Sequence, residues 1–137
     1  MESWLATATM GISAHFLYFM LAIGAIILFV AIYAAITPYP EITLIRAGNT
    51  AAAVSLGGAI LGYTIPLAQA VAQSGSLPDM LIWSAVALVA QLLAFVVTRL
   101  TLPRLVTDVV EGKLASGVFL AAISIAIGML NAAAMTD

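Results

Sequence analysis

Four long apolar runs, almost free of charge, constrain what this chain can fold into. The runs lie at about 12–36, 49–71, 79–99 and 114–135. Each is about 20 residues or more, the length that a helix needs to cross the hydrocarbon core of a bilayer. Only 7% of the 137 residues are charged, against about 25% in a soluble domain, so lipid must be the main solvent of this chain. Because a backbone in hydrocarbon must satisfy its own hydrogen bonds, each run predicts a membrane-spanning helix.

The connections between the runs contain helix breakers and short amphipathic segments. Pro38 and Pro40 should end the first helix, because proline lacks a backbone donor and blocks the preceding turn. Segment 101–112 has apolar residues on one helical face and charged residues on the other, which predicts a short amphipathic helix along the inner leaflet. Pro103 suits the first turn of that helix, and Gly112 suits its C-terminal cap.

A shift of 64 residues aligns the two halves of the chain and brings Gly48 onto Gly112. In both halves a membrane helix leads to a short amphipathic segment, a glycine stop and a helix rich in small residues. We therefore predict an all-α, integral membrane four-helix bundle in one domain, residues 1–137, built from two tandem two-helix units at 12–71 and 79–135. Each unit has two spans, so both should enter the membrane in the same, parallel orientation.

The ends of the predicted helices hold the residues that orient a membrane protein. All basic residues fall in or beside the two amphipathic connections: Arg46, Arg99, Arg104 and Lys113. The tails and the connection 72–78 have none, so the positive-inside rule predicts cytoplasmic amphipathic connections and two periplasmic termini. We expect the basic side chains to contact lipid headgroups or a cytoplasmic or peripheral partner, and Trp4, Tyr39 and Trp83 to anchor helix ends at the interface.

Small residues form a stripe along the second run. The stripe comprises Ala51, Ser55, Gly58 and Gly62. Small side chains let two helix backbones approach closely, so this face predicts helix packing, and the second and fourth runs should lie at the centre. The stripe could pack within one chain or against another copy. We expect a homo-oligomer, a dimer or larger, because four thin helices enclose a small interior.

Neutral polar residues inside the runs are candidates for a small polar cavity. The set is Tyr63, Thr64, Pro66, Gln69, Gln91 and Asn131. Pro66 cannot donate to the carbonyl of Gly62, so the helix should kink or loosen there. The alternative is that the amides join helices and the proline has no special role. Because no charged residue lies in a predicted membrane core, a coupled pump is disfavoured.

Several function classes lack the residues they need. The chain has no cysteine, and His15 is its single histidine, so disulfides, thiolate sites and the usual zinc spacings are excluded. Serine–histidine–acid triads and phosphate loops are also missing, so we expect no enzyme activity, metal or cofactor. The net charge of −2 offers no basic patch for nucleic acid.

Several segments carry a resemblance to a known family. They are ITP at 36–38, NTAAA at 49–53, GYTIPL at 62–67, ALVAQLL at 87–93 and NAAAMT at 131–136. The chain resembles small bacterial inner-membrane proteins of the domain-of-unknown-function family 350. That resemblance implies a four-helix inner-membrane protein of two tandem units. Members are similar to proteins encoded beside phage-shock-type peripheral proteins and ATP-grasp enzymes, which implies envelope maintenance and assigns no reaction.

Two functional hypotheses follow from these features. The first is a non-enzymatic, oligomeric scaffold or anchor that presents its amphipathic connections to cytoplasmic or peripheral envelope-maintenance partners. The alternative is a passive pore or facilitator for small solutes, such as ions or polyamines, formed by the bundle or its oligomer.

Overall fold

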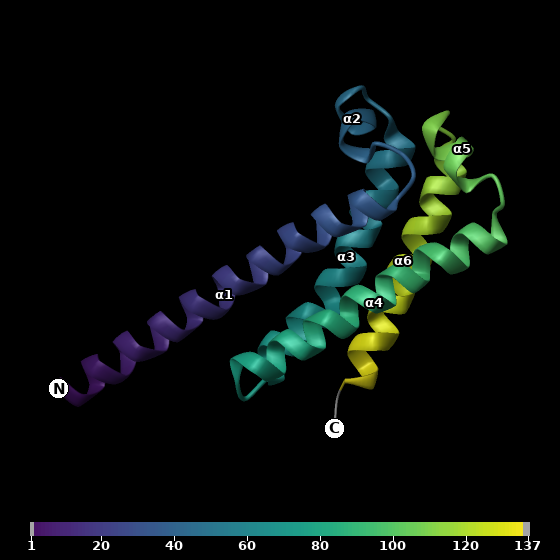
Figure 1. Ribbon diagram of the computed structural model, residues 1–137. Coiled ribbons are helices and arrows are strands. Elements are labelled where there is room, and N and C mark those ends of the chain that lie inside the picture. Colours follow the sequence, from purple (N-terminus) through teal and green to yellow (C-terminus); the bar gives the residue numbers. More distant parts are fainter. Residues whose placement is uncertain (1, 136–137) are drawn as a thin grey trace.

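The computed structural model describes residues 2–135, which form six helices and no strand (Figure 1). In chain order these are α1 (Glu2–Ile36), α2 (Glu41–Arg46), α3 (Thr50–Gln73), α4 (Leu77–Thr101), α5 (Leu105–Val110) and α6 (Leu114–Ala134). Four of them, α1, α3, α4 and α6, are long and apolar enough to cross a membrane. The predicted all-α membrane protein with four spanning helices is confirmed. Thr136, which ends the C-terminal family motif, lies outside the described residues.

Helix α1 ends as predicted but begins earlier. It stops at Ile36, just before Pro38 and Pro40. It starts at Glu2, about ten residues before the predicted start, because only Gly11 weakens the helix in that stretch and no proline breaks it. A helix of 35 residues is about 52 Å long, more than the roughly 30 Å of hydrocarbon in a bilayer. Helix α1 must therefore tilt or extend beyond the membrane core.

Helices α3 and α6 lie against each other at the centre, α4 packs on both, and α1 diverges from them toward its N-terminal end (Figure 1). Glycines replace side chains along the α3–α6 contact. A β-carbon on any of them would overlap the opposite helix, and the facing pairs are Gly58 with Ala121, Gly62 with Ser124, Gly117 with Ala51 and Gly128 with Gly62. The predicted central position of the two small-residue helices is confirmed, and the stripe on α3 faces α6 of the same chain.

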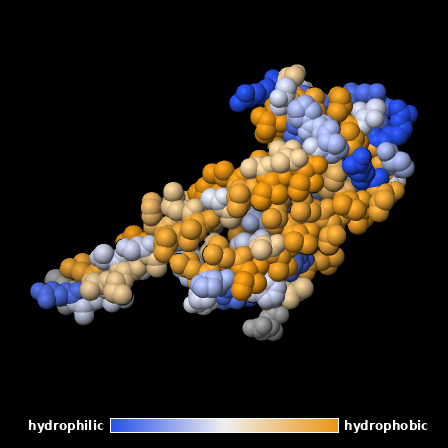
Figure 2. All heavy atoms as spheres, in the orientation of Figure 1, coloured by the Kyte–Doolittle hydropathy of each residue, from blue (hydrophilic) through white to orange (hydrophobic). Residues whose placement is uncertain are grey.

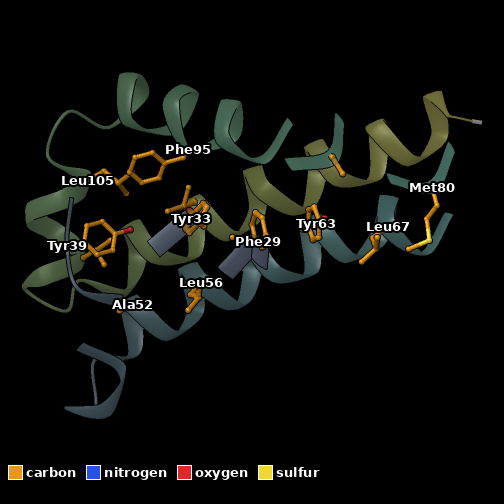
Figure 3. Packing of buried hydrophobic residues seen from close by; sticks show 14 residues of the cluster. Phe29, Tyr33, Tyr39, Ala52, Leu56, Tyr63, Leu67, Met80, Phe95 and Leu105 are labelled. Carbon is orange, nitrogen blue, oxygen red and sulfur yellow. The ribbon is translucent and has the colours of Figure 1, made fainter. Parts of the chain in front are cut away.

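The buried apolar side chains form one long core. Figure 3 shows it running from Tyr39 and Leu105, through Phe29 and Tyr63, to Leu67 and Met80. The rings of Phe29 and Tyr63 stack with their centroids 4.4 Å apart, which joins α1 to α3. Phe29 and Tyr33 are the buried residues of α1, and Tyr18, Ala22 and Ile26 pack partly against the core. Most other apolar side chains in the first two-thirds of this helix are exposed. Such exposed apolar surface is expected where lipid replaces water.

Helices α2 and α5 end in the same way. Gly48 and Gly112 follow them with positive φ angles of 89° and 78°, a conformation that glycine adopts without steric cost. Both ends form a Schellman motif, in which two late N–H groups donate to carbonyls of the last turn. The donor–acceptor pairs are Gly48–Ile45 (3.0 Å), Asn49–Leu44 (2.9 Å), Gly112–Val109 (3.0 Å) and Lys113–Asp108 (2.8 Å). Both glycine stops are confirmed, and the duplication of two units stays a prediction.

Helix α5 differs from the predicted amphipathic helix in two respects. Pro103 precedes the helix instead of lying in its first turn, because Arg104 occupies the N-cap position with φ −99° and ψ 16°. Leu102 has the extended backbone expected of a residue before proline, with φ −117° and ψ 89°. The apolar side chains of Leu105 and Val109 are fully buried. Helix α5 therefore packs this face on the protein and not on the inner leaflet.

Candidate functional site

Most of the charged residues of the molecule gather at one end, which we call the polar cap. It comprises residues 37–49 and 102–113, which contain α2 and α5. Figure 2 shows hydrophilic residues concentrated at this end and a largely hydrophobic surface along the long helices. The N-terminal end of α1 and the C-terminal end of α6 lie at the opposite end (Figure 1). The candidates Arg46, Arg104 and Lys113 lie in the cap, Arg99 lies in the adjoining last turn of α4, and all four are exposed.

Asn49 joins the two halves of the polar cap. Its side-chain oxygen accepts a hydrogen bond from the N–H of Ala52 (3.0 Å), which caps α3. Its amide nitrogen donates to the carbonyl of Val109 (2.8 Å), at the end of α5. One side chain therefore fixes the start of α3 to the end of α5 and holds the cap together.

A small ionic group lies on the α5 side of the polar cap. The ammonium of Lys113 lies 3.4 Å from carboxylate oxygens of both Asp108 and Glu111. The hydroxyl of Ser116 donates to the second oxygen of Asp108 (2.9 Å). The Ser116 hydroxyl and, after it, the Lys113 ammonium hold the pKa of Asp108 below its usual value. Arg46, unlike Lys113, makes no ion pair with any described residue.

An acid is buried where the polar cap meets α1. Glu41, at the start of α2, is only 1% exposed, and Tyr33 and Tyr39 beside it are 1% and 4% exposed. Both carboxyl oxygens of Glu41 and both phenol oxygens are buried, and none has a hydrogen-bond partner among the described residues. We call these three residues the acid cluster. Burying an unpaired carboxylate costs several kcal/mol, so this arrangement is unusual in a chain with so few charges.

Burial changes the acidity of the cluster. It raises the pKa of Glu41 from 4.5 to about 7, an increase that the nearby hydroxyl of Thr37 partly offsets. Burial, and then the charge of Glu41, raises the pKa of Tyr39 well above its usual value. A carboxyl group in this position changes charge near neutral pH, whereas an exposed glutamate is fully ionised there.

The sequence reasoning missed this cluster. The prediction that Tyr39 anchors a helix end at the lipid interface is wrong, because its ring is buried in the protein core. Glu41 has the sequence position of an ordinary first-turn acid in an amphipathic segment, which gives no hint of burial. The available signal was the close spacing of an acid and two tyrosines around Pro38 and Pro40, since a proline turn can fold such side chains together.

The six residues proposed for a polar cavity face different surroundings. Thr64 lines an open wedge of about 590 Å³ between α1 and α3, where His15 and Tyr18 also lie. Tyr63 lines a second hollow of about 380 Å³ between α1 and α4. Gln69 lines a third, of about 270 Å³, beside the connection from α3 to α4. The structure therefore distributes these side chains over three hollows instead of bringing them to one.

The remaining three lie inside the helix packing. Gln91 is fully buried and donates to the carbonyl of Ser124 in α6 (3.1 Å), while its side-chain oxygen has no described partner. Pro66 is buried, and α3 continues through it as a single helix. The amide nitrogen of Asn131 is buried without a described partner. Gln91 thus joins α4 to α6, as expected of an amide between membrane helices.

Comparison with known proteins gives a consistent match over nearly the whole chain. The family model described as Domain of Unknown Function (DUF350) matches residues 6–135. The UPF0719 inner membrane protein YjfL of Escherichia coli (strain K12) is 41% identical over 119 residues, which cover 87% of this chain and 90% of the relative. The UPF0719 transmembrane protein YshE of Bacillus subtilis (strain 168) is 29% identical over 91 residues, or 66% of this chain and 68% of the relative. No solved structure matches.

Proposed function

This chain belongs to the DUF350 family of multi-pass membrane proteins, and we propose that it is a non-enzymatic scaffold that anchors cytoplasmic or peripheral envelope-maintenance proteins to the bacterial inner membrane. The observation that carries the proposal is the polar cap. The basic residues and both short helices gather there, while the long helices present apolar surface to lipid. A water-soluble partner could bind only where the protein reaches water, and the cap is the most polar such surface.

The charges of the polar cap suit a partner with acidic groups. Arg46, Arg99 and Arg104 are exposed, and none makes an ion pair with a described residue. Arginine presents several donors in a planar fork that matches carboxylates and phosphates. Asn49 holds α5 against the start of α3, which reduces the ordering cost of binding on that side of the cap. By the positive-inside rule this face lies in the cytoplasm.

The proposal includes a homo-oligomer. The small-residue stripe on α3 is already covered by α6, so a contact between copies would have to use another face. Helix α1 offers one, because none of its residues before Phe29 is buried. A second copy packed there would protect a helix that this chain alone leaves in lipid.

Site-specific photocrosslinking in cells tests the scaffold. A photoreactive residue at Thr43 or Thr107, both exposed in the polar cap, should capture the same cytoplasmic protein, and one at Gly75 at the opposite end should not. Replacing Arg46 and Arg104 together by lysine removes the planar forks but keeps the positive charges that orient the protein, so capture should weaken while the orientation stays the same. A photoreactive residue at Phe16 should capture a second copy. Capture of lipid alone from both cap positions would contradict the proposal.

The alternative of a passive pore finds less support. Three of the candidate polar residues face separate hollows and the other three lie inside the helix packing. The glycine contacts of α3 with α6 leave no room for a solute between these helices. A pore would therefore have to form between copies, along surfaces whose exposed side chains are mainly apolar.

A further inference from the structure

The acid cluster contains the one fully buried carboxyl group among the described residues, and no described basic side chain forms an ion pair with it. The groups that face Glu41 are Tyr33 from α1 and Thr37 and Tyr39 from the connection. Helix α3 contributes Ser55, which lies beside Tyr39 and donates its own hydrogen to the carbonyl of Ala52 (3.0 Å). All of these groups are neutral at physiological pH.

The basic residues of the polar cap do not compensate Glu41. Arg46, on α2 itself, is exposed at the far end of that helix. Lys113 is bound by Asp108 and Glu111 on the α5 side, and Arg104 is exposed there and acts on Asp108. An ionised Glu41 would therefore be a lone charge in a core of low dielectric, whereas the neutral acid keeps a hydroxyl that can donate to a neighbouring oxygen.

We propose that Glu41 is a proton-binding site that controls the docking of α2. With the carboxyl group neutral, α2 packs on α3 and the acid cluster is closed. With it ionised, the carboxylate regains water by leaving Tyr33 and Tyr39, and α2 moves away from α3 with it. Asn49 still ties the start of α3 to α5, so the movement is confined to residues 37–48. The inference concerns the cap itself and holds whether or not the cap recruits a partner.

The direction of the pH effect follows from the two states of α2. In the undocked state Glu41 is exposed and has an ordinary pKa near 4.5, and in the docked state burial raises its pKa to about 7. Below pH 4.5 both states hold the proton and docking is strongest. Between about 4.5 and 7 each pH unit weakens the docking equilibrium of α2 by up to tenfold. Above pH 7 docking is at its weakest and does not change further with pH. Alkaline conditions therefore open the polar cap, and acidification closes it.

The chain has no cysteine, so two labels can be placed cleanly. Spin labels at Thr43→Cys on α2 and Thr107→Cys on α5, both exposed, report the distance across the polar cap in lipid nanodiscs. The distance distribution should be narrow at pH 5 and should broaden and lengthen by pH 8.5. Adding Glu41→Gln, which mimics the neutral acid, should keep it narrow throughout. The matched control Glu111→Gln removes an exposed acid of the same cap and should leave the pH response unchanged.

Two results would overturn the proposal. One is an unchanged distance between pH 4.5 and 8.5, and the other is a pH response that persists in Glu41→Gln. A second measurement needs no substitution at Glu41: the infrared band of a neutral carboxylic acid should disappear from the wild-type protein as pH rises through about 7. Absence of such a band at pH 5.5, where Glu41 should still hold its proton, would also reject the proton site, even if the glutamine variant failed to fold.

Discussion

Two adjacent glycines of α3 have opposite surroundings. A β-carbon on Gly57 would meet no atom within 4 Å, whereas one on Gly58 would overlap both the β-carbon and the backbone of Ala121 in α6. The spacing of the small-residue stripe includes Gly58 and leaves Gly57 out. The crossing of α3 and α6 distinguishes them, because a rigid backbone opposite Gly58 cannot move aside as a flexible side chain would.

Replacing each glycine by alanine tests this difference. Gly58→Ala should destabilise the protein by about 1–3 kcal/mol, the usual cost of overpacking a tight interior. Gly57→Ala should leave stability unchanged or slightly raised, since alanine restricts the unfolded chain more than glycine does. Denaturant titration in mixed micelles measures both. Adding Ala121→Gly should not rescue Gly58→Ala, because the backbone of residue 121 still overlaps, and full rescue would contradict this close contact of α3 with α6.

At the scale of elements, the sequence predicts those helix positions and helix ends that depend on local signals. The spanning helices follow from the lengths of the apolar runs, and α1 ends before Pro38 because proline lacks a backbone donor. Helices α2 and α5 stop at Gly48 and Gly112 because glycine permits a positive φ angle. Each of these features is determined within a few residues.

The acid cluster could not be predicted in that way. The residues that bury Glu41 are Tyr33, a full turn before the end of α1, and Tyr39, after the proline turn. They cover the acid only when α1 and α2 both lie against α3. An acid in the first turn of a short helix is normally hydrated, so its burial is a tertiary property. For the same reason the sequence indicates Tyr63, Thr64 and Gln69 of α3 individually, but it does not predict their separation into different hollows.

Gln91 tests how α4 is held against the central pair. Gln91→Leu removes a hydrogen bond to Ser124, which destabilises the protein, and a buried oxygen without a described partner, which stabilises it. The two effects oppose each other, so the free energy of unfolding should change by less than about 1 kcal/mol. Gln91→Ala should cost more, about 2–4 kcal/mol, because it leaves a cavity beside α3 and α6. Unfolding in mixed micelles compares the two variants. If Gln91→Leu abolished an ion or polyamine flux measured in liposomes, the pore hypothesis would regain support.

At the scale of the whole molecule, the alternation of four long helices places α2 and α5 at one end and the outer ends of α1 and α6 at the other (Figure 1). Which end faces the cytoplasm is a prediction from the basic residues alone. Since that prediction rests on four basic side chains, a direct measurement of which side of the membrane each end faces is more decisive.

Single cysteines in a chain that has none provide that measurement. Val110→Cys in the polar cap should react with a membrane-impermeant maleimide only in inverted vesicles. Gly75→Cys and Ala134→Cys should react in intact cells, because they lie at the opposite end. Labelling of Val110→Cys and Ala134→Cys from the same side would contradict the four-span arrangement. Reversal of both sides would preserve the fold and overturn the proposed cytoplasmic cap.

The glycine contact of α3 with α6 also sets an order of events during synthesis. About forty residues separate the end of α3 from the start of α6, and α6 itself adds 21. At about 5–20 residues per second, a ribosome needs roughly 3–12 seconds after completing α3 to complete α6. During that interval only lipid or the insertion machinery covers the groove of α3 around Gly58 and Gly62, which α6 later fills. A ribosome stalled within α4 would leave this groove open to any small-residue helix that diffuses past in the bilayer.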